Sequence, residues 1–215
     1  MAKTKRTEKL NSLLKEVISE IITKEVRDPR LGSLITVTGV DITKDLHQEA
    51  ETTAFAQLLL SGNITKEQYT NYLFQMIAIY KLIEHFSERQ GFFDTLPDIE
   101  RLPGIYQDFL ELEDPATTYH LVPSTAAYVS YLIDMDSNPT RKHLVKAHLY
   151  VRHMGDLFGG QIIKSRVPGR GRFYEFTDAT ALKAAIRAEL TDDLGDEARI
   201  AFEWAIKIMR ELTGE

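Results

Sequence analysis

The chain has no cysteine among its 215 residues. This absence excludes disulfide bonds, thiolate nucleophiles, iron–sulfur clusters and thiolate-ligated heme. Long apolar runs are missing too, since no stretch approaches the roughly 18 apolar residues that a membrane-spanning helix needs. The first residues carry charges with no apolar core after them, so they do not form a secretory signal. We therefore expect no membrane association and a cytoplasmic location.

Positive charge is in short supply. The chain has 26 Lys and Arg against 32 Asp and Glu, which gives a net charge of -6. Because nucleic-acid phosphates require a basic protein surface, binding to nucleic acid or to a ribosome is not expected. Without cysteine, any metal or heme must be held by His, Met, Tyr or carboxylate side chains.

The hydrophobic pattern divides the chain into two unlike parts. Residues 6–26 carry apolar side chains at three- and four-residue spacings, which predicts a helix, and the alternating β-branched residues 34–40 predict one short strand. The pattern is helical afterwards, with predicted helices at 42–60, 65–88, 98–113, 124–135, 139–166, 178–191 and 195–213. We predict an all-α domain over residues 42–215, preceded by a helix and a short strand in residues 1–41.

The helix expected at 65–88 shows the clearest pattern. Thr65 and Gln68 have the spacing of a capping box, which predicts its start. Its apolar and aromatic residues recur at helical spacing, and we interpret them mainly as packing: Tyr69, Tyr72, Leu73, Met76, Ile79, Tyr80 and Ile83.

Three glycines within six residues, Gly155, Gly159 and Gly160, interrupt a segment that is otherwise helical. A glycine inside a helix costs roughly 1 kcal/mol relative to alanine, so the segment needs a reason for them. Close approach of a bulky, flat group to the backbone is one reason, and a helix crossing or a break between two helices is another. Asp156 lies between them, either as a solvated surface residue or as a group that organises water and passes protons to a bound reactant.

His47 is the second candidate, at the start of a predicted helix. Glu51 lies one turn later on the same face. A neutral imidazole that binds heme iron through one nitrogen needs a partner for its other N–H, and a carboxylate at this spacing could serve directly or through water. The pair could equally be an exposed helical pair.

Two segments resemble the motifs of heme oxygenases. Residues 147–164 read Ala-His-Leu-Tyr-Val-Arg-His-Met-Gly-Asp-Leu-Phe-Gly-Gly-Gln-Ile-Ile-Lys, which is similar to that family's distal-helix motif. Residues 47–51, His-Gln-Glu-Ala-Glu, resemble its proximal-helix motif. The resemblance covers residues 42–213 and implies a multi-helix heme oxygenase fold. It implies an enzyme that opens heme b, as both cofactor and substrate, to biliverdin, ferrous iron and carbon monoxide, with O2 and electrons from ferredoxin or a reductase.

The resemblance also implies roles for the candidates. His47 becomes the axial ligand of heme iron, with Glu51 its helical neighbour near the ring. Asp156 becomes the holder of a water network that delivers protons during the oxygen reaction. Three glycines let the distal helix lie against the porphyrin: Gly155, Gly159 and Gly160.

Further residues match family positions around the heme. The propionates are expected to meet Lys44, Tyr150, Lys183 and Arg187, and Phe202 is a further cofactor contact. Charge-assisted bonds of this kind fix the rotation of the ring, and their retention favours the α-meso product, biliverdin IXα. The distal segment departs from the family pattern at two positions: Phe158 stands where Ser is usual, and His153 stands where Tyr is common.

The amino-terminal part resembles another family. Residues 6–46, including the Asp-Pro-Arg turn at 28–30, are similar to the start of ribosome-binding factor A, which has a small KH-type fold. Only the first helix and strand of that fold are present, and a lone strand has no sheet to join. Ribosome binding is therefore not expected from this resemblance. Two alternatives to the enzyme remain. One is a ribosome-assembly factor. The other is a non-catalytic heme-binding or heme-sensing protein, in which Phe158 crowds out oxygen.

Overall fold

The computed structural model describes residues 46–96 and 98–215. The predicted helix at 6–26, the strand at 34–40, the boundary between residues 41 and 42, and Lys44 lie outside the described residues. Within the described part the chain is helical and has no strand, which confirms the predicted all-α class. Its main helices are α3 (Ala54–Ser61), α4 (Lys66–Arg89), α5 (Leu102–Leu112), α6 (Pro123–Ser137), α7 (Val145–Ile163), α8 (Ala179–Ala188) and α9 (Gly195–Glu211). None of these described helices is long and apolar enough to cross a membrane.

Helix α4 begins at the predicted capping box. The Thr65 side chain accepts the backbone N–H of Gln68, and the Gln68 side chain accepts the backbone N–H of Thr65. Two N–H groups that the helix leaves without partners are thereby satisfied. The aromatic stripe of α4 is buried, as expected, and forms much of the core.

The prediction of one helix over residues 42–60 was wrong at Thr53. Residues 46–52 are helical, a bend follows at Thr53, and α3 begins at Ala54. The Thr53 hydroxyl donates to the carbonyl of Ala50 and accepts the backbone N–H of Ala56. It thus ends one helix and caps the next, which is how threonine competes with continuous helical hydrogen bonding.

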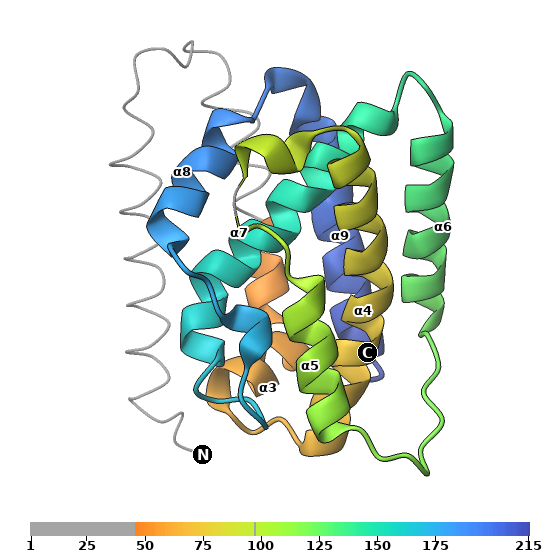
Figure 1. Cartoon of the computed structure of the whole chain (residues 1–215). Coiled ribbons are helices and arrows are strands. Elements are labelled where there is room, and N and C mark those ends of the chain that lie inside the picture. The colour runs from red at the N-terminus through yellow and green to blue at the C-terminus, as the bar shows by residue number, and fades with distance from the viewer. Residues whose placement is uncertain (1–45, 97) are drawn as a thin grey trace. The chain divides into compact units, whose positions relative to one another are not determined.

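Helix α4 packs against α5, α6 and α7, and α9 packs against α3, α6 and α7 (Figure 1). Helix α7 crosses the bundle and is also in contact with α8 and with the short helix η3 (Arg172–Tyr174). The glycine-containing helix therefore has neighbours on several sides, and each of its faces meets a different environment.

Candidate active site

The helical residues 46–52 place His47 beside α9. The His47 ring lies 4.3 Å from the ring of Phe202, centroid to centroid, with the planes at 62°. Burial lowers the pKa of the imidazole below its usual value, so the ring is neutral at pH 7. Burial also raises the pKa of Glu51. Among the described residues no hydrogen bond joins His47 to Glu51, so the structure supplies a neutral imidazole packed against an aromatic ring.

A small apolar cluster connects this region to α7. Phe202 packs in it with Ala147 and Val151 of α7, and Leu46 and Tyr150 lie at its margin. One cluster therefore contains Leu46, which precedes His47, and the predicted cofactor contacts Tyr150 and Phe202.

Helix α7 runs without interruption through its glycines, from Val145 to Ile163, so the segment is not a break between two helices. Gly155 is exposed, and a Cβ atom added there meets nothing within 4 Å among the described residues. A Cβ added at Gly159 meets only Ile163 Cδ1, at 3.7 Å. These two glycines, one turn apart, leave a strip of helix backbone open to the approach of a flat group.

Gly160 lies on a different face of α7. A Cβ added there would come within 2.5 Å of Tyr174 Cδ1 and 3.2 Å of Tyr174 Cβ. Tyr174 is buried in η3 and its position is fixed by the core. Gly160 therefore allows η3 to pack closely on α7, a structural reason that the sequence pattern did not distinguish from the other two.

The two kinds of glycine predict opposite effects of alanine. Gly160→Ala is expected to destabilise the heme-free protein by about 1–3 kcal/mol, because Tyr174 must move. Gly155→Ala should leave its stability unchanged or raise it by up to about 1 kcal/mol, the helix-propensity difference, while weakening hemin binding. Urea unfolding and hemin titration of both variants measure this, and equal losses of stability would contradict it.

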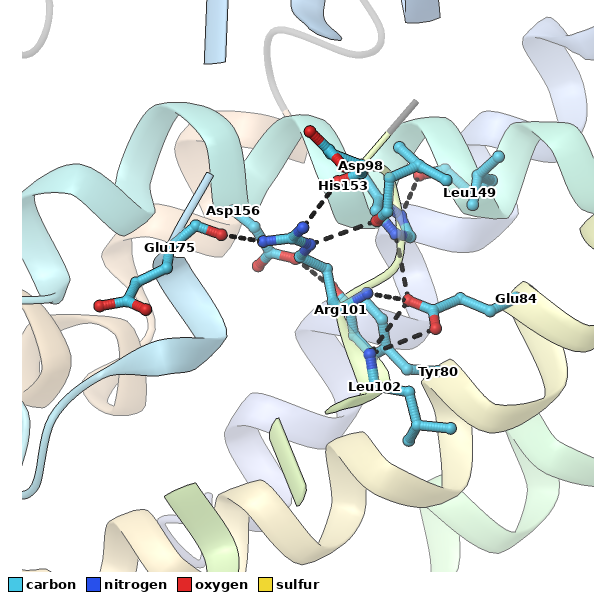
Figure 2. Close-up of polar contacts among 10 residues, drawn as sticks. Tyr80, Glu84, Asp98, Arg101, Leu102, Leu149, His153, Asp156 and Glu175 are labelled. Carbon is cyan, nitrogen blue, oxygen red and sulfur yellow. Dashed lines mark hydrogen bonds and ion pairs between the residues drawn. The ribbon is translucent and has the colours of Figure 1, made fainter. Parts of the chain in front are cut away.

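Asp156 is buried in α7, on the side that faces α4. The Tyr80 hydroxyl of α4 donates a hydrogen bond to Asp156 Oδ2 (Figure 2). Burial raises the pKa of Asp156 to about 6, against the opposing effects of His153, the Tyr80 hydrogen bond, Arg152 and Arg101. The carboxyl group can therefore be protonated or ionised near neutral pH, which suits a group that holds and passes protons.

Arg152, one turn before Asp156, is also buried. Its guanidinium lies 5.3 Å from the centre of the Tyr128 ring. Nε and Nη2 have no hydrogen-bond partner within residues 46–96 and 98–215. Since buried donors of this kind are normally satisfied, by protein or by water, Arg152 marks a polar place in the interior next to Asp156.

Helix α8 contributes the predicted basic pair. Lys183 Nζ lies 3.9 Å from the centre of the Phe158 ring, and Arg187 Cζ lies 5.8 Å from it. Burial raises the pKa of Tyr150, and the nearby charge of Arg187 opposes this effect. The structure therefore brings the four residues Tyr150, Phe158, Lys183 and Arg187 together where α7 meets α8.

Tyr80 and Arg152 were not among the residues predicted for the site. Tyr80 looked like part of the packing stripe, and its only signal was a hydroxyl that must find a partner when the ring is buried. His148 of α7 has partners apart from the candidate site: its ring contacts the Tyr128 hydroxyl at 2.7 Å and Glu197 Oε1 at 3.0 Å.

The fold and the site together define an all-α protein that has a neutral imidazole packed beside α9 and a buried acid on a glycine-bearing helix. A family model described as heme oxygenase matches residues 41–211. The chain is 30% identical to heme oxygenase 1 from Nostoc sp., over 80% of this chain and 83% of that protein. It is 27% identical to bovine heme oxygenase 1, over 81% of this chain and 70% of that protein.

Solved structures agree with this. The crystal structure of heme oxygenase-1 from the cyanobacterium Synechocystis sp. in complex with heme superimposes with a TM-score of 0.69. The two chains are 25% identical, over 82% of this chain and 90% of that one. The chain belongs to the heme oxygenase family, which confirms the predicted resemblance.

A second family model, described as ribosome-binding factor A, matches residues 6–73. That match covers less than half of the chain and extends beyond residue 46, where the resemblance was expected to end. Its described part is helical, and Phe55, Leu59 and Tyr69 in it belong to the main core of the bundle. Residues 46–73 are therefore part of the helical domain.

Proposed function

We propose that the protein cleaves heme b, with O2 and electrons, to biliverdin, ferrous iron and carbon monoxide. The observation that carries this proposal is the placement of Asp156, buried and bonded to Tyr80, between Gly155 and Gly159. Cβ atoms added at these two glycines meet little or nothing within 4 Å in the described part of the chain. A proton-holding group next to an open helix face is what an oxygen reaction beside a flat ring requires. The family supplies the class of reaction.

The residues present fit a heme. His47 is neutral because it is desolvated, so one ring nitrogen is available to bind iron. Gly155 and Gly159 leave room for the ring. Two buried nitrogens of Arg152 that have no partner among the described residues indicate a polar group or water beside Asp156. Bound heme supplies the iron at which oxygen is reduced and the ring carbon that is oxidised.

Asp156 is the proposed catalytic acid. With a pKa of about 6, roughly one carboxyl in ten is protonated at pH 7. Burial also keeps the pKa of Tyr80 well above its usual value, so its hydroxyl stays protonated and continues to donate to Asp156. Tyr80 thus fixes one carboxylate oxygen and leaves the other to hold water.

Lys183, Arg187 and Tyr150 are proposed to bind the heme propionates, and Phe202 to contact the ring together with His47. Lys44 is proposed for the same role as Lys183, and Glu51 as the polar neighbour of His47. Ionic bonds at the propionates would fix the rotation of the ring in its plane, and therefore which meso carbon is attacked. The proposed product is biliverdin IXα.

Changing Lys183 and Arg187 together to Ala is expected to convert a single biliverdin isomer into a mixture, because the ring loses its charge-assisted anchors. Chromatography of the extracted pigment measures this. Lys207→Ala, which removes an exposed lysine of α9 that lies over Trp204, is the control and should leave the isomer unchanged. An unchanged isomer in the double variant would remove the pair from the propionate site.

The remaining parts of the proposal concern partners and organisation. Electrons are supplied by ferredoxin or by a reductase, and the protein acts in the cytoplasm. Residues 42–215 form the oxygenase domain, and residues 1–41 form an appendage.

The match of residues 6–73 favours one second candidate, a role in ribosome assembly. Co-sedimentation with small ribosomal subunits tests it, and the net charge of -6 and the helical fold of residues 46–73 weigh against it. A heme carrier or sensor is the other alternative. The Phe158 ring lies against Lys183 of α8, and this contact gives it a packing role.

The absorption spectrum separates the enzyme from the carrier. The purified protein is mixed with hemin and supplied with ferredoxin, its reductase and NADPH in air. We expect a Soret band that forms and then gives way to the broad red absorption of biliverdin. A Soret band that persists would establish a carrier or sensor instead.

A further inference from the structure

Two neighbouring polar pairs join α4 to α7. Tyr80 and Glu84 are one turn apart on α4, and His153 and Asp156 are one turn apart on α7 (Figure 2). Tyr80 is bonded to Asp156, and Glu84 faces His153. The second pair has no part in the function proposed above, yet both of its members are buried, Glu84 at 4% exposure and His153 at 0%.

The hydrogen bonds of His153 leave one ring nitrogen unsatisfied. Nδ1 lies 2.9 Å from the carbonyl oxygen of Leu149, and a carbonyl can only accept, so Nδ1 carries a hydrogen. Nε2 has no hydrogen-bond partner in the described part of the chain. The group that it faces is Glu84, whose Oε1 lies 3.5 Å away.

Both oxygens of the Glu84 carboxyl group accept hydrogen bonds at the start of α5. Its Oε1 accepts the backbone N–H of Arg101 at 2.6 Å, and Oε2 accepts that of Leu102 at 3.2 Å. These are N–H groups at the start of a helix, where the helix dipole is positive, and both effects favour a carboxylate anion. A neutral His153 would therefore direct a lone pair at an anion inside the protein.

We propose that His153 is a buried imidazolium paired with the Glu84 carboxylate, and that this pair is a positioning device that sets the charge state of the neighbouring Asp156. Protonation of Nε2 replaces the contact between a lone pair and an anion by a contact between a donor and an acceptor. The effect of the pair on heme cleavage rests on the proposed function. The charge of the pair is independent of that function.

The pair is coupled to Asp156 by charge and by packing. The positive charge of His153 is the largest effect that opposes burial and lowers the pKa of Asp156. The His153 ring also packs against the Tyr80 ring, with the centroids 5.3 Å apart, so it supports the donor of the Asp156 hydrogen bond.

Other charged groups surround the pair of Glu84 and His153. Arg101 is fixed by the backbone carbonyls of Asp98, Ile99 and Glu175, so its charge is not used by Glu84 in a side-chain ion pair. The titratable and charged groups around the pair are Tyr80 and Glu88 on α4, Asp98, Glu100 and Arg101 before α5, Arg152 and Asp156 on α7, and Glu175 after η3.

The first test uses the unaltered heme-free chain. Nitrogen-15 NMR of the labelled histidine rings distinguishes protonated from unprotonated ring nitrogens. We expect both nitrogens of His153 to be protonated at pH 7, and the Nε2 proton to be lost in Glu84→Gln. An unprotonated Nε2 in the unaltered protein overturns the proposal, whether or not the protein cleaves heme.

The second test measures the carboxyl group of Asp156 by carbon-13 NMR. In His153→Phe the pKa of Asp156 is expected to rise from about 6 by about one unit, because a nearby positive charge is lost. The pH profile of biliverdin formation should shift in the same direction. His85→Ala, an exposed neighbour of Glu84 on α4, is the control and should leave both unchanged. An Asp156 pKa that stays near 6 in His153→Phe would show that the pair does not set it.

Discussion

His47→Ala is expected to abolish the normal iron complex and, with it, the formation of biliverdin. His47 is the described histidine whose ring packs against Phe202, next to the cluster that joins α9 to α7. Loss of a group that only supports a metal ligand typically costs about 10–100-fold in affinity or activity, so loss of the ligand itself should cost more. Hemin is still expected to enter the apolar site, but with a different spectrum.

The measurement is a hemin titration followed by optical and electron paramagnetic resonance spectra. Added imidazole should restore much of the normal spectrum in His47→Ala, because it fits the space that the side chain leaves. His120→Ala, which removes an exposed histidine, should behave like the unaltered protein. A normal spectrum in His47→Ala without imidazole would show that another residue binds the iron.

Asp156→Ala and Asp156→Asn are expected to bind hemin normally and to lose biliverdin formation. The carboxyl group is buried on the α4 side of α7, so its removal does not disturb His47, and it takes away the group that holds the proton. Proton transfer by a positioned side chain typically contributes about 100- to 10,000-fold, and a loss of that size is expected here. In both variants the heme should be diverted to unproductive oxidation.

The pKa of Asp156 predicts the direction in which the rate changes with pH. Asp156 has a pKa of about 6, so its protonated fraction falls roughly tenfold for each pH unit above that value. The rate of the unaltered protein should fall above pH 6 if this proton is used, and Asp156→Asn should lose that dependence. Asparagine can still accept from Tyr80, so a full rate in Asp156→Asn would remove Asp156 from the mechanism.

Most of the helical fold could be predicted from local signals. The capping box at Thr65 and Gln68 and the stripe on α4 have strong physical causes within a single helix. The break at Thr53 could not be predicted, since threonine is tolerated inside helices and only its two hydrogen bonds show that it ends one. Nothing in the composition distinguishes it from Thr52.

The candidate site was predictable only where the family pattern names a residue. His47, Asp156, Lys183 and Arg187 carry groups whose chemistry is visible in the sequence, and the structure places the last two beside Phe158. Tyr80 and Asp156 are 76 residues apart, and their contact depends on how α4 packs against α7. Glu84 and His153 depend on the same packing.

The three glycines of α7 show a second limit of prediction from the sequence. The pattern of three glycines left two kinds of cause open: a flat group against the backbone, or a helix crossing or break. The structure separates Gly155 and Gly159, which face little or nothing within residues 46–96 and 98–215, from Gly160, which must be small because Tyr174 lies against it. Such a difference arises from what packs on each face of α7, which no local pattern contains.

The most direct measurement is the product balance of one turnover. The hemin-loaded protein is reduced without oxygen, and then O2 is added together with ferredoxin, its reductase and NADPH. We expect the heme that disappears to be matched by equal amounts of biliverdin and carbon monoxide. Heme that persists, or that is bleached without either product, would contradict the assignment of the protein as a heme-cleaving enzyme.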